Sequence, residues 1–334
     1  MSDTAAPHRA ADAPGPSLPA SSLVTAPASL PRRIGSSDLR VFPIALSGTV
    51  FGWTADGPTT TSILDRFVEL GGTLIDTADS YAGGRSEIMI GNWMRERRIR
   101  DRVTIATKVG KSPDHPGLSA PAIRAAVDAS LRRLRVSSID LLFLHVDDPE
   151  VPYDETLLAV DELIRAGKVR YFGGSDHTGE RLFEARIAAG QLGVAHMVAL
   201  QKHYNLVHRD EYEGALARVA GQLDMGVMPR YALAAGFLTG KYRSRSDIER
   251  EKRGAEVAHY VNRRGLRILS ALDRIAEDGG RDVATIGLAW LLSRPHVVAP
   301  VVSVSAPAQL DAIMAAPTTP LSRHQLTELD RVSD

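Results

Sequence analysis

Residues 73–108 read TLIDTADSYAGGRSEIMIGNWMRERRIRDRVTIATK, and this stretch decides how we interpret the chain. A short apolar run ends in Asp76, and Tyr81 follows in a loop that the next two glycines allow to turn. A second apolar run ends at Lys108. If both runs are neighbouring parallel strands, a carboxylate, a phenol and an ammonium meet at one end of a sheet.

These three side chains have a chemical use in common. A free tyrosine keeps its proton until about pH 10 and is a weak acid at neutral pH. An ammonium beside the phenol stabilises the phenolate, and a carboxylate can hold the ammonium in place. The stretch therefore predicts a general acid that gives a proton to an oxygen atom.

The rest of the chain alternates short apolar runs with stretches of helical spacing. The strand-like runs lie at 42–46, 73–75, 103–107, 139–144, 169–172, 197–200, 227–228 and 297–302. Helical spacing separates most of them, for example at 62–70, 122–134, 155–166, 182–189 and 266–277. Eight such runs joined by helices predict parallel βα units, and the length suits a closed (β/α)8 TIM barrel better than an open sheet.

The N-terminal part differs from the rest. Residues 32–41, RRIGSSDLRV, have two short arms around a Gly-Ser-Ser turn, which predicts a β-hairpin. Residues 1–31 are rich in Ala, Pro and Ser, and we expect a disordered tail because they bury too little apolar surface to offset the entropy of ordering. We interpret residues 32–334 as a single barrel domain.

The composition excludes several classes of function. Basic and acidic residues number 40 each, which argues against nucleic acid or an anionic membrane as partner. The absence of cysteine excludes disulfides and thiolate sites, and we find no metal motif. With no signal peptide and no apolar run of roughly 20 residues, we expect a cytoplasmic protein. The basic run at 95–102 is interpreted as a solvated surface.

The barrel hypothesis places functional residues where strands end. His145 ends the run IDLLFLHVDDP and could donate a hydrogen bond to a substrate or relay a proton. Alternatively it is a core histidine satisfied by the backbone, Asp76 caps a turn, and Lys108 is a surface lysine. Convergence of these residues with Tyr81 at one barrel end favours the catalytic interpretation.

At this point the sequence resembles a known family. The blocks IDTADSY, ATKVG, IDLLFLHVDDP, AGKVRYFGGSD, LQKHYNLVHRD and GFLTGKY occur in this order within residues 32–316. Through them the chain is similar to the aldo-keto reductases, which implies a barrel that binds NADP(H), or alternatively NAD(H), without a Rossmann domain. The resemblance implies a tetrad in which Tyr81 protonates a carbonyl oxygen, Lys108 and Asp76 activate Tyr81, and His145 orients the carbonyl. Hydride comes from the nicotinamide.

The resemblance also implies a set of cofactor-binding residues. They are Thr49, Asp76, Ser175, Asp176, Gln201, Arg230, Leu233, Gly236, Leu238, Gly240, Lys241, Ser303, Ser305 and Gln309. Ser175 and Gln201 match positions for the carboxamide, and the segment 236–241 matches the loop over the pyrophosphate. Asp176 replaces the usual Asn and Arg230 the usual aromatic ring, and we hypothesise that they form a compensating ion pair. The last strand offers hydroxyls rather than a cation for a 2′-phosphate.

The substrate is expected to be a small carbonyl compound or alcohol, and the oligomeric state is left open. Val50, Trp53, Val146 and Tyr204 are candidate substrate contacts by position, although Trp53 could equally pack on the barrel rim. We interpret the charged segment 244–262 as a solvated helix. Two alternatives remain: a weakly catalytic regulatory subunit of the same fold, as in potassium-channel β subunits, and a Schiff-base lyase or isomerase using Lys108.

Overall fold

The computed structural model describes Met1 and residues 31–250 and 254–334. The predicted disordered tail, residues 1–31, lies almost entirely outside the described residues. Eight parallel strands follow the order β10-β3-β4-β5-β6-β7-β8-β9 and form a nearly closed barrel. A parallel bridge between Val227 and Val297 joins the two ends of this order. The predicted (β/α)8 TIM barrel is therefore confirmed.

The eight strands coincide with the eight predicted runs. They are β3 (Ala45–Ser47), β4 (Leu74–Asp76), β5 (Thr104–Val109), β6 (Ile139–Leu144), β7 (Val169–Ser175), β8 (Ala199–His203), β9 (Gly226–Arg230) and β10 (Val301–Val302). Several run further toward the C-terminus than predicted, because polar residues such as Ser175 and Gln201 still pair with the neighbouring strand.

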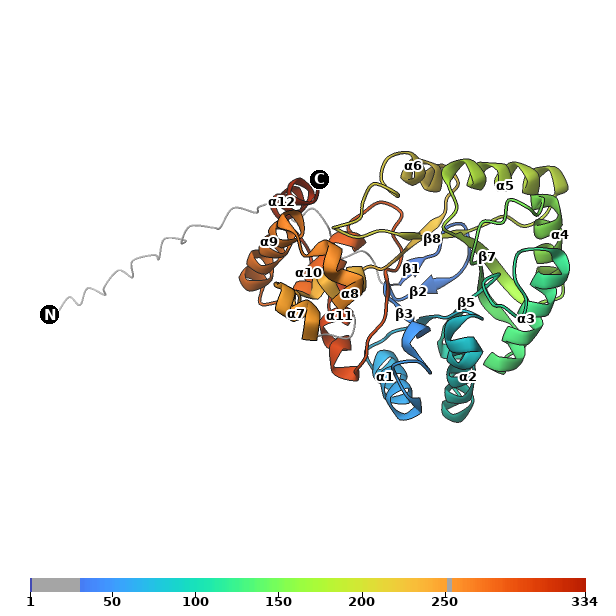
Figure 1. The fold of residues 1–334 in the computed structure, drawn as a ribbon, viewed down its shortest axis with the longest axis horizontal. Helices are drawn as coiled ribbons and strands as arrows, with labels where there is room; N and C mark the ends of the chain where they lie inside the picture. The colour runs from blue at the N-terminus through green and yellow to red at the C-terminus, as the bar shows by residue number, and fades with distance from the viewer. Residues whose placement is uncertain (2–30, 251–253) are drawn as a thin grey trace.

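Helices surround the strands (Figure 1). They are α1 (Gly57–Glu69), α2 (Arg85–Arg97), α3 (Ala120–Leu134), α4 (Tyr153–Arg165), α5 (Gly179–Leu192), α6 (Ala215–Gln222), α7 (Arg245–Arg250), α8 (Gly254–Val257), α9 (Arg263–Gly279), α10 (Val283–Leu292), α11 (Leu310–Met314) and α12 (Arg323–Ser333). The charged segment predicted as one solvated helix instead contains the short helices α7 and α8. No helix in the described part of the chain is long and apolar enough to cross a bilayer.

The predicted N-terminal hairpin closes one end of the barrel. Its strands β1 (Arg32–Arg33) and β2 (Arg40–Val41) pair antiparallel. Ile34 and Leu39 are buried in the same apolar cluster as the residues that fill the barrel interior. Gly35 has φ +48°, and a Cβ there would lie 2.1 Å from the carbonyl oxygen of Val198, so only glycine fits this close approach. The hairpin does not cover the opposite end of the barrel, where the strands finish, and this end is open for a functional site.

The side-chain alternation of the strands aims polar residues into that opposite end. Leu74, Ala106, Phe143, Ala199 and Met228 fill the barrel interior. Successive residues of a strand point to opposite faces, so the residue two positions further on points inward again. Counting two residues from each of these five gives Asp76, Lys108, His145, Gln201 and Arg230.

Candidate active site

Three of the four predicted tetrad residues form one hydrogen-bonded group. The ammonium of Lys108 donates to Asp76 Oδ2 at 2.6 Å, to the carbonyl oxygen of Thr77 at 2.8 Å and to the phenol oxygen of Tyr81 at 3.3 Å. The side chains of Lys108 and Asp76 are only 2% and 1% exposed. The short helix η2 (Tyr81–Gly84) holds the phenol in place directly after β4. The geometry therefore matches the predicted general acid.

The second oxygen of Asp76 is also used. Gln201 Nε2 donates to Asp76 Oδ1 at 2.6 Å. The strands that carry these residues, β4 and β8, are four places apart in the barrel order and so face each other across the interior. A carboxylate can only accept here, so the bond fixes which end of the Gln201 amide points at it. The amide oxygen of Gln201 remains an acceptor for another group.

The surroundings of Lys108 keep it charged. Burial alone would lower its pKa, but the charge of Asp76 and the contact with Tyr81 outweigh burial and raise the pKa. An amine must be neutral to attack a carbonyl carbon. This geometry therefore suits an electrostatic role for Lys108 and does not suit the Schiff-base alternative.

His145 lies beside the phenol with a neutral ring. The rings of Tyr81 and His145 meet edge to face, with centroids 6.0 Å apart. Burial, together with the charges of Lys108, Lys111 and Arg230, lowers the pKa of His145 to about 2. Its Nδ1 is buried without a hydrogen-bond partner in the described residues. His145 is thus an uncharged group that can form hydrogen bonds.

The hypothesised ion pair at the two unusual positions is present. Arg230 Nη2 lies 2.7 Å from both carboxylate oxygens of Asp176. Their side chains are 31% and 30% exposed, so water reaches the pair. Asp176 has φ +61°, a left-handed conformation that Asn and Asp tolerate better than most residues. The Asp176 carboxylate is therefore occupied by a protein group.

The other predicted cofactor residues line the strand ends from β7 round to β3. Ser175 and Gln201 are each 1% exposed at neighbouring strand ends. After β9, Gly236 and Gly240 have φ +100° and +84° and shape the loop that contains Leu233, Leu238 and Lys241. After β10, Gln309 accepts hydrogen bonds from the backbone and hydroxyl of Ser305, near Ser303. Thr49 pairs with the hydroxyl of Ser47 after β3.

The four candidate substrate contacts differ in placement. Val50 belongs to η1 (Gly48–Val50), which packs against the η2 that carries Tyr81. Trp53 is 62% exposed, so most of its ring is open to solvent. Val146 directly follows His145 and is partly buried against the core.

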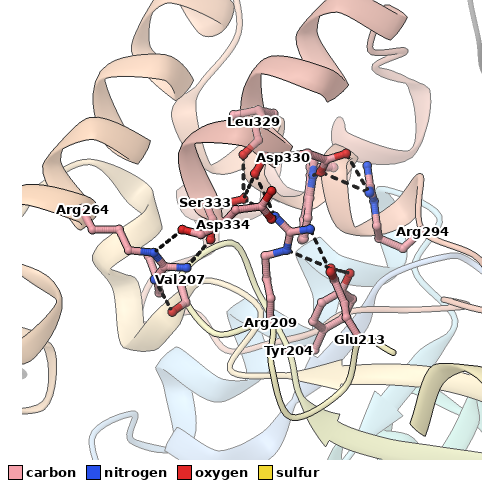
Figure 2. A network of polar contacts seen from close by, with 11 residues as sticks. Tyr204, Val207, Arg209, Glu213, Arg264, Arg294, Leu329, Asp330, Ser333 and Asp334 are labelled. Carbon is pink, nitrogen blue, oxygen red and sulfur yellow. Dashed lines mark hydrogen bonds and ion pairs between the residues drawn. The ribbon is translucent and has the colours of Figure 1, made fainter. Parts of the chain in front are cut away.

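Tyr204 instead packs in the core. It is 1% exposed, its hydroxyl donates to Glu213 at 2.6 Å, and its ring lies 5.6 Å from that of Trp290. Figure 2 shows it inside a polar network that also includes Arg209 and the α12 residue Asp330. This packing leaves almost no surface of Tyr204 for a substrate.

A second buried acid near the tetrad was not predicted to have a role. Asp79 is 2% exposed, and its carboxylate faces the backbone N–H groups of Ser80 and Gly110 without a well-aligned hydrogen bond. Burial and the nearby charge of Glu87 raise the pKa of Asp79 to about 6. The signal available in the sequence was its place in the IDTADSY block.

Glu87 differs from Asp79 by having partners. It is fully buried on α2, accepts a hydrogen bond from Thr107 at 2.6 Å and pairs with Arg133 of α3 at 2.6 Å. Thr107 is the residue before Lys108, so this ion pair supports β5 from behind. Nothing in the local sequence connects Glu87 with a partner 46 residues away.

Comparison with known proteins agrees with this geometry. The aldo/keto reductase family model matches residues 47–334. The chain is 30% identical to aldo-keto reductase AFTS1 of Alternaria alternata, over 88% of this chain and 89% of that one. It is 29% identical to norsolorinic acid reductase B of Aspergillus parasiticus, over 80% and 75%. It is 30% identical to a probable voltage-gated potassium channel β subunit of Arabidopsis thaliana, over 85% and 90%.

The family model covers most of the chain. The chain therefore belongs to the aldo/keto reductase family and is an oxidoreductase enzyme.

Proposed function

We propose that this member of the aldo/keto reductase family reduces an aldehyde or ketone with NADPH, with Tyr81 as the proton donor. The observation that carries the proposal is the buried Lys108 ammonium, which lies 2.6 Å from Asp76 and 3.3 Å from the phenol oxygen of Tyr81. A positive charge at this place stabilises the phenolate that forms when Tyr81 gives up its proton. The same groups serve alcohol oxidation in reverse.

The donor set suits a nicotinamide carboxamide. Such a group needs an acceptor for its NH2 and a donor for its oxygen. The amide oxygen of Gln201 supplies the acceptor, because its nitrogen is held by Asp76. The hydroxyl of Ser175, at the adjacent strand end, supplies the donor. Asp176 is therefore not required for these contacts. The carboxamide can be bound although Asp176 replaces the usual Asn.

The chain's own residues then carry the proton chemistry. A bound reduced nicotinamide supplies a hydride to the carbonyl carbon. Tyr81 gives its proton to the carbonyl oxygen, and Lys108 stabilises the phenolate until a proton returns from solvent. The uncharged ring of His145 offers a hydrogen bond that orients the carbonyl without competing as an acid. NADPH is preferred over NADH on the family resemblance, with Lys241 near the phosphates.

The test is Tyr81→Phe, which removes one oxygen atom and keeps the ring. We expect turnover of a reactive aldehyde to fall by about 100-fold or more, because general acid catalysis contributes about that factor. NADPH affinity, followed by fluorescence, should stay within about twofold, since Tyr81 makes no contact on which the proposed cofactor site depends. Tyr171→Phe, at the other end of the barrel, is the matched control. Full activity in Tyr81→Phe would overturn the assignment.

A second candidate function follows from the similarity to potassium channel β subunits. In that case the protein binds the cofactor tightly and serves a partner, with slow chemistry. The ion pair of Arg230 with Asp176 favours this candidate, because it places a charged group where the family usually has an aromatic ring. Tight NADPH binding with no aldehyde or ketone turned over would support it, whereas rapid turnover lost in Tyr81→Phe would exclude it.

A further inference from the structure

A cavity of about 650 Å³ lies at the end of the barrel opposite the tetrad. It is lined by residues that directly precede strands, including Thr73 before β4, Val103 before β5 and Ser138 before β6. Strands of six residues span roughly 20 Å, so this cavity is distinct from the proposed active site. The hairpin strand β2 contributes to its wall through Arg40.

Arginine dominates the cavity wall. The lining contains five arginines and two aspartates, an excess of three positive charges in a chain whose net charge is zero: Arg40, Arg100, Arg102, Arg135, Arg170, Asp101 and Asp140. The five arginines come from β2, the short helix η3 (Arg100–Arg102), the end of α3 and β7, and Asp140 comes from β6. A concave surface lined by one sign of charge focuses the field and concentrates counter-ions.

Two of the arginines are held in place by a buried acid. Asp140 is 5% exposed and accepts the backbone N–H of Ile105 at 2.8 Å. One of its carboxylate oxygens lies 2.8 Å from Arg100 and the other 3.1 Å from Arg170. Arg100 also donates to the carbonyl oxygens of Val103 and Ser138, each at 3.0 Å. These guanidinium groups therefore sit in fixed orientations before any ligand arrives.

The other three arginines have no such partner. Within residues 31–250 and 254–334, the side chains of Arg40, Arg102 and Arg135 make no hydrogen bond or ion pair. Asp140 is already shared between Arg100 and Arg170, which leaves Asp101 as the remaining acidic residue in the wall. The cavity thus combines two fixed guanidinium groups with three that are free to bind an anion.

We propose that this cavity is a binding site for a small polyphosphate-type anion. Guanidinium groups bind phosphate oxygens through paired N–H donors, and several such groups around one ligand suit several negative charges. The volume is that of a small-molecule site, and the polar wall does not suit an apolar ligand. Arg100 and Arg102, from the basic run at 95–102, meet Arg135 from the end of α3 in this cavity.

The test is calorimetric titration of inorganic triphosphate into the full chain at fixed ionic strength. NADPH is added at one equivalent per chain so that any loop that binds the cofactor's phosphates is occupied, and the titration is repeated without NADPH because its own phosphates could compete for the cavity. The site variant is Arg102→Gln with Arg135→Gln. The matched control is Arg95→Gln with Arg98→Gln, which removes the same charge from the same basic region outside the cavity. Arg98 and Arg135 both have left-handed φ, 52° and 56°, so backbone effects are matched too.

We expect one triphosphate per chain, with affinity about tenfold or more weaker in the site variant and within about twofold in the control. No saturable binding to the native chain, or equal losses in both variants, would overturn the proposal. Tighter binding of short duplex DNA through the same two arginines would also overturn it, because a nucleic acid would then be the ligand. If NADPH fails to bind, the proposed function fails, but the comparison of site variant with control still decides this proposal.

Discussion

Two acid–base pairs stand at the same end of the barrel and differ chiefly in their access to water. Asp76 and Lys108, from β4 and β5, lie 2.6 Å apart with side chains 1% and 2% exposed. Asp176, directly after β7, and Arg230, at the end of β9, lie 2.7 Å apart with side chains 30% and 31% exposed. The N–O distances of the two ion pairs are almost equal, so distance does not distinguish the pairs.

Desolvation does tell them apart. A buried pair has lost its hydration, so removing one partner leaves an uncompensated charge in the interior. A pair that water reaches is screened, and its contribution to stability is small. We therefore expect a change at the buried pair to cost more stability than a change at the exposed pair.

The largest expected effect comes from breaking the buried pair. Lys108→Met should lower the free energy of unfolding by about 3–5 kcal/mol, because the buried Asp76 carboxyl is left without its cation. Arg230→Met is the matched control, with an expected loss of about 1 kcal/mol or less. Both are measured by urea unfolding without cofactor. Equal losses in the two variants would contradict the role given to burial.

A second prediction concerns Asp79, a buried acid whose carboxylate has no hydrogen-bond partner in the described residues. The pKa of Asp79 in the folded protein is about 6, above the ordinary value of 3.8. The folded state therefore holds this proton more tightly than the unfolded state, and stability from this group is lost as pH rises from about 4 through 6. Two units of pKa correspond to about 3 kcal/mol.

Asp79→Asn removes this titration. We expect the variant to be more stable than the native protein by up to about 3 kcal/mol at pH 8 and nearly equal to it at pH 4. The measurement is the difference between the two unfolding free energies at each pH, so that other titrating groups cancel. A difference that does not change with pH would show that burial does not perturb this acid.

Much of the site was predictable because strand periodicity is a local property. Each apolar run could be located in the sequence. A polar residue two positions beyond an inward-facing residue must point into the end of the barrel where the strands finish, which we call the mouth. That argument places Asp76, Lys108 and His145 together, whereas the pairing of Asp176 with Arg230 was suggested by the family resemblance, which assigns both residues to one pocket.

What could not be predicted depends on packing between distant segments. The bond from Gln201 to Asp76 crosses the barrel between residues 125 apart. Tyr204 was assigned by position to the substrate, but its neighbour Trp290 lies on α10, which the sequence does not place there. The cavity beside Arg100 and Arg102 could not be predicted from the basic run at 95–102, because the other arginines that line it lie elsewhere in the chain.

The smallest expected effect concerns the exposed pair and tests whether Asp176 and Arg230 compensate each other. Asp176→Asn and Arg230→Gln should each weaken NADPH binding by a few fold, and the double variant should lose less than their product. The expected coupling is about 0.5–1 kcal/mol and should shrink as salt is added, because water reaches both groups.

The same double-mutant cycle on Asp128 and Lys168, an ion pair of 2.6 Å with side chains 41% and 40% exposed, provides the control. These residues lie on α3 and before β7, away from the mouth, so they should show no coupling in NADPH affinity. Purely additive losses at Asp176 and Arg230 would mean that the two departures from the family pattern arose independently, and that the exposed side of the mouth does not act as a unit on the cofactor.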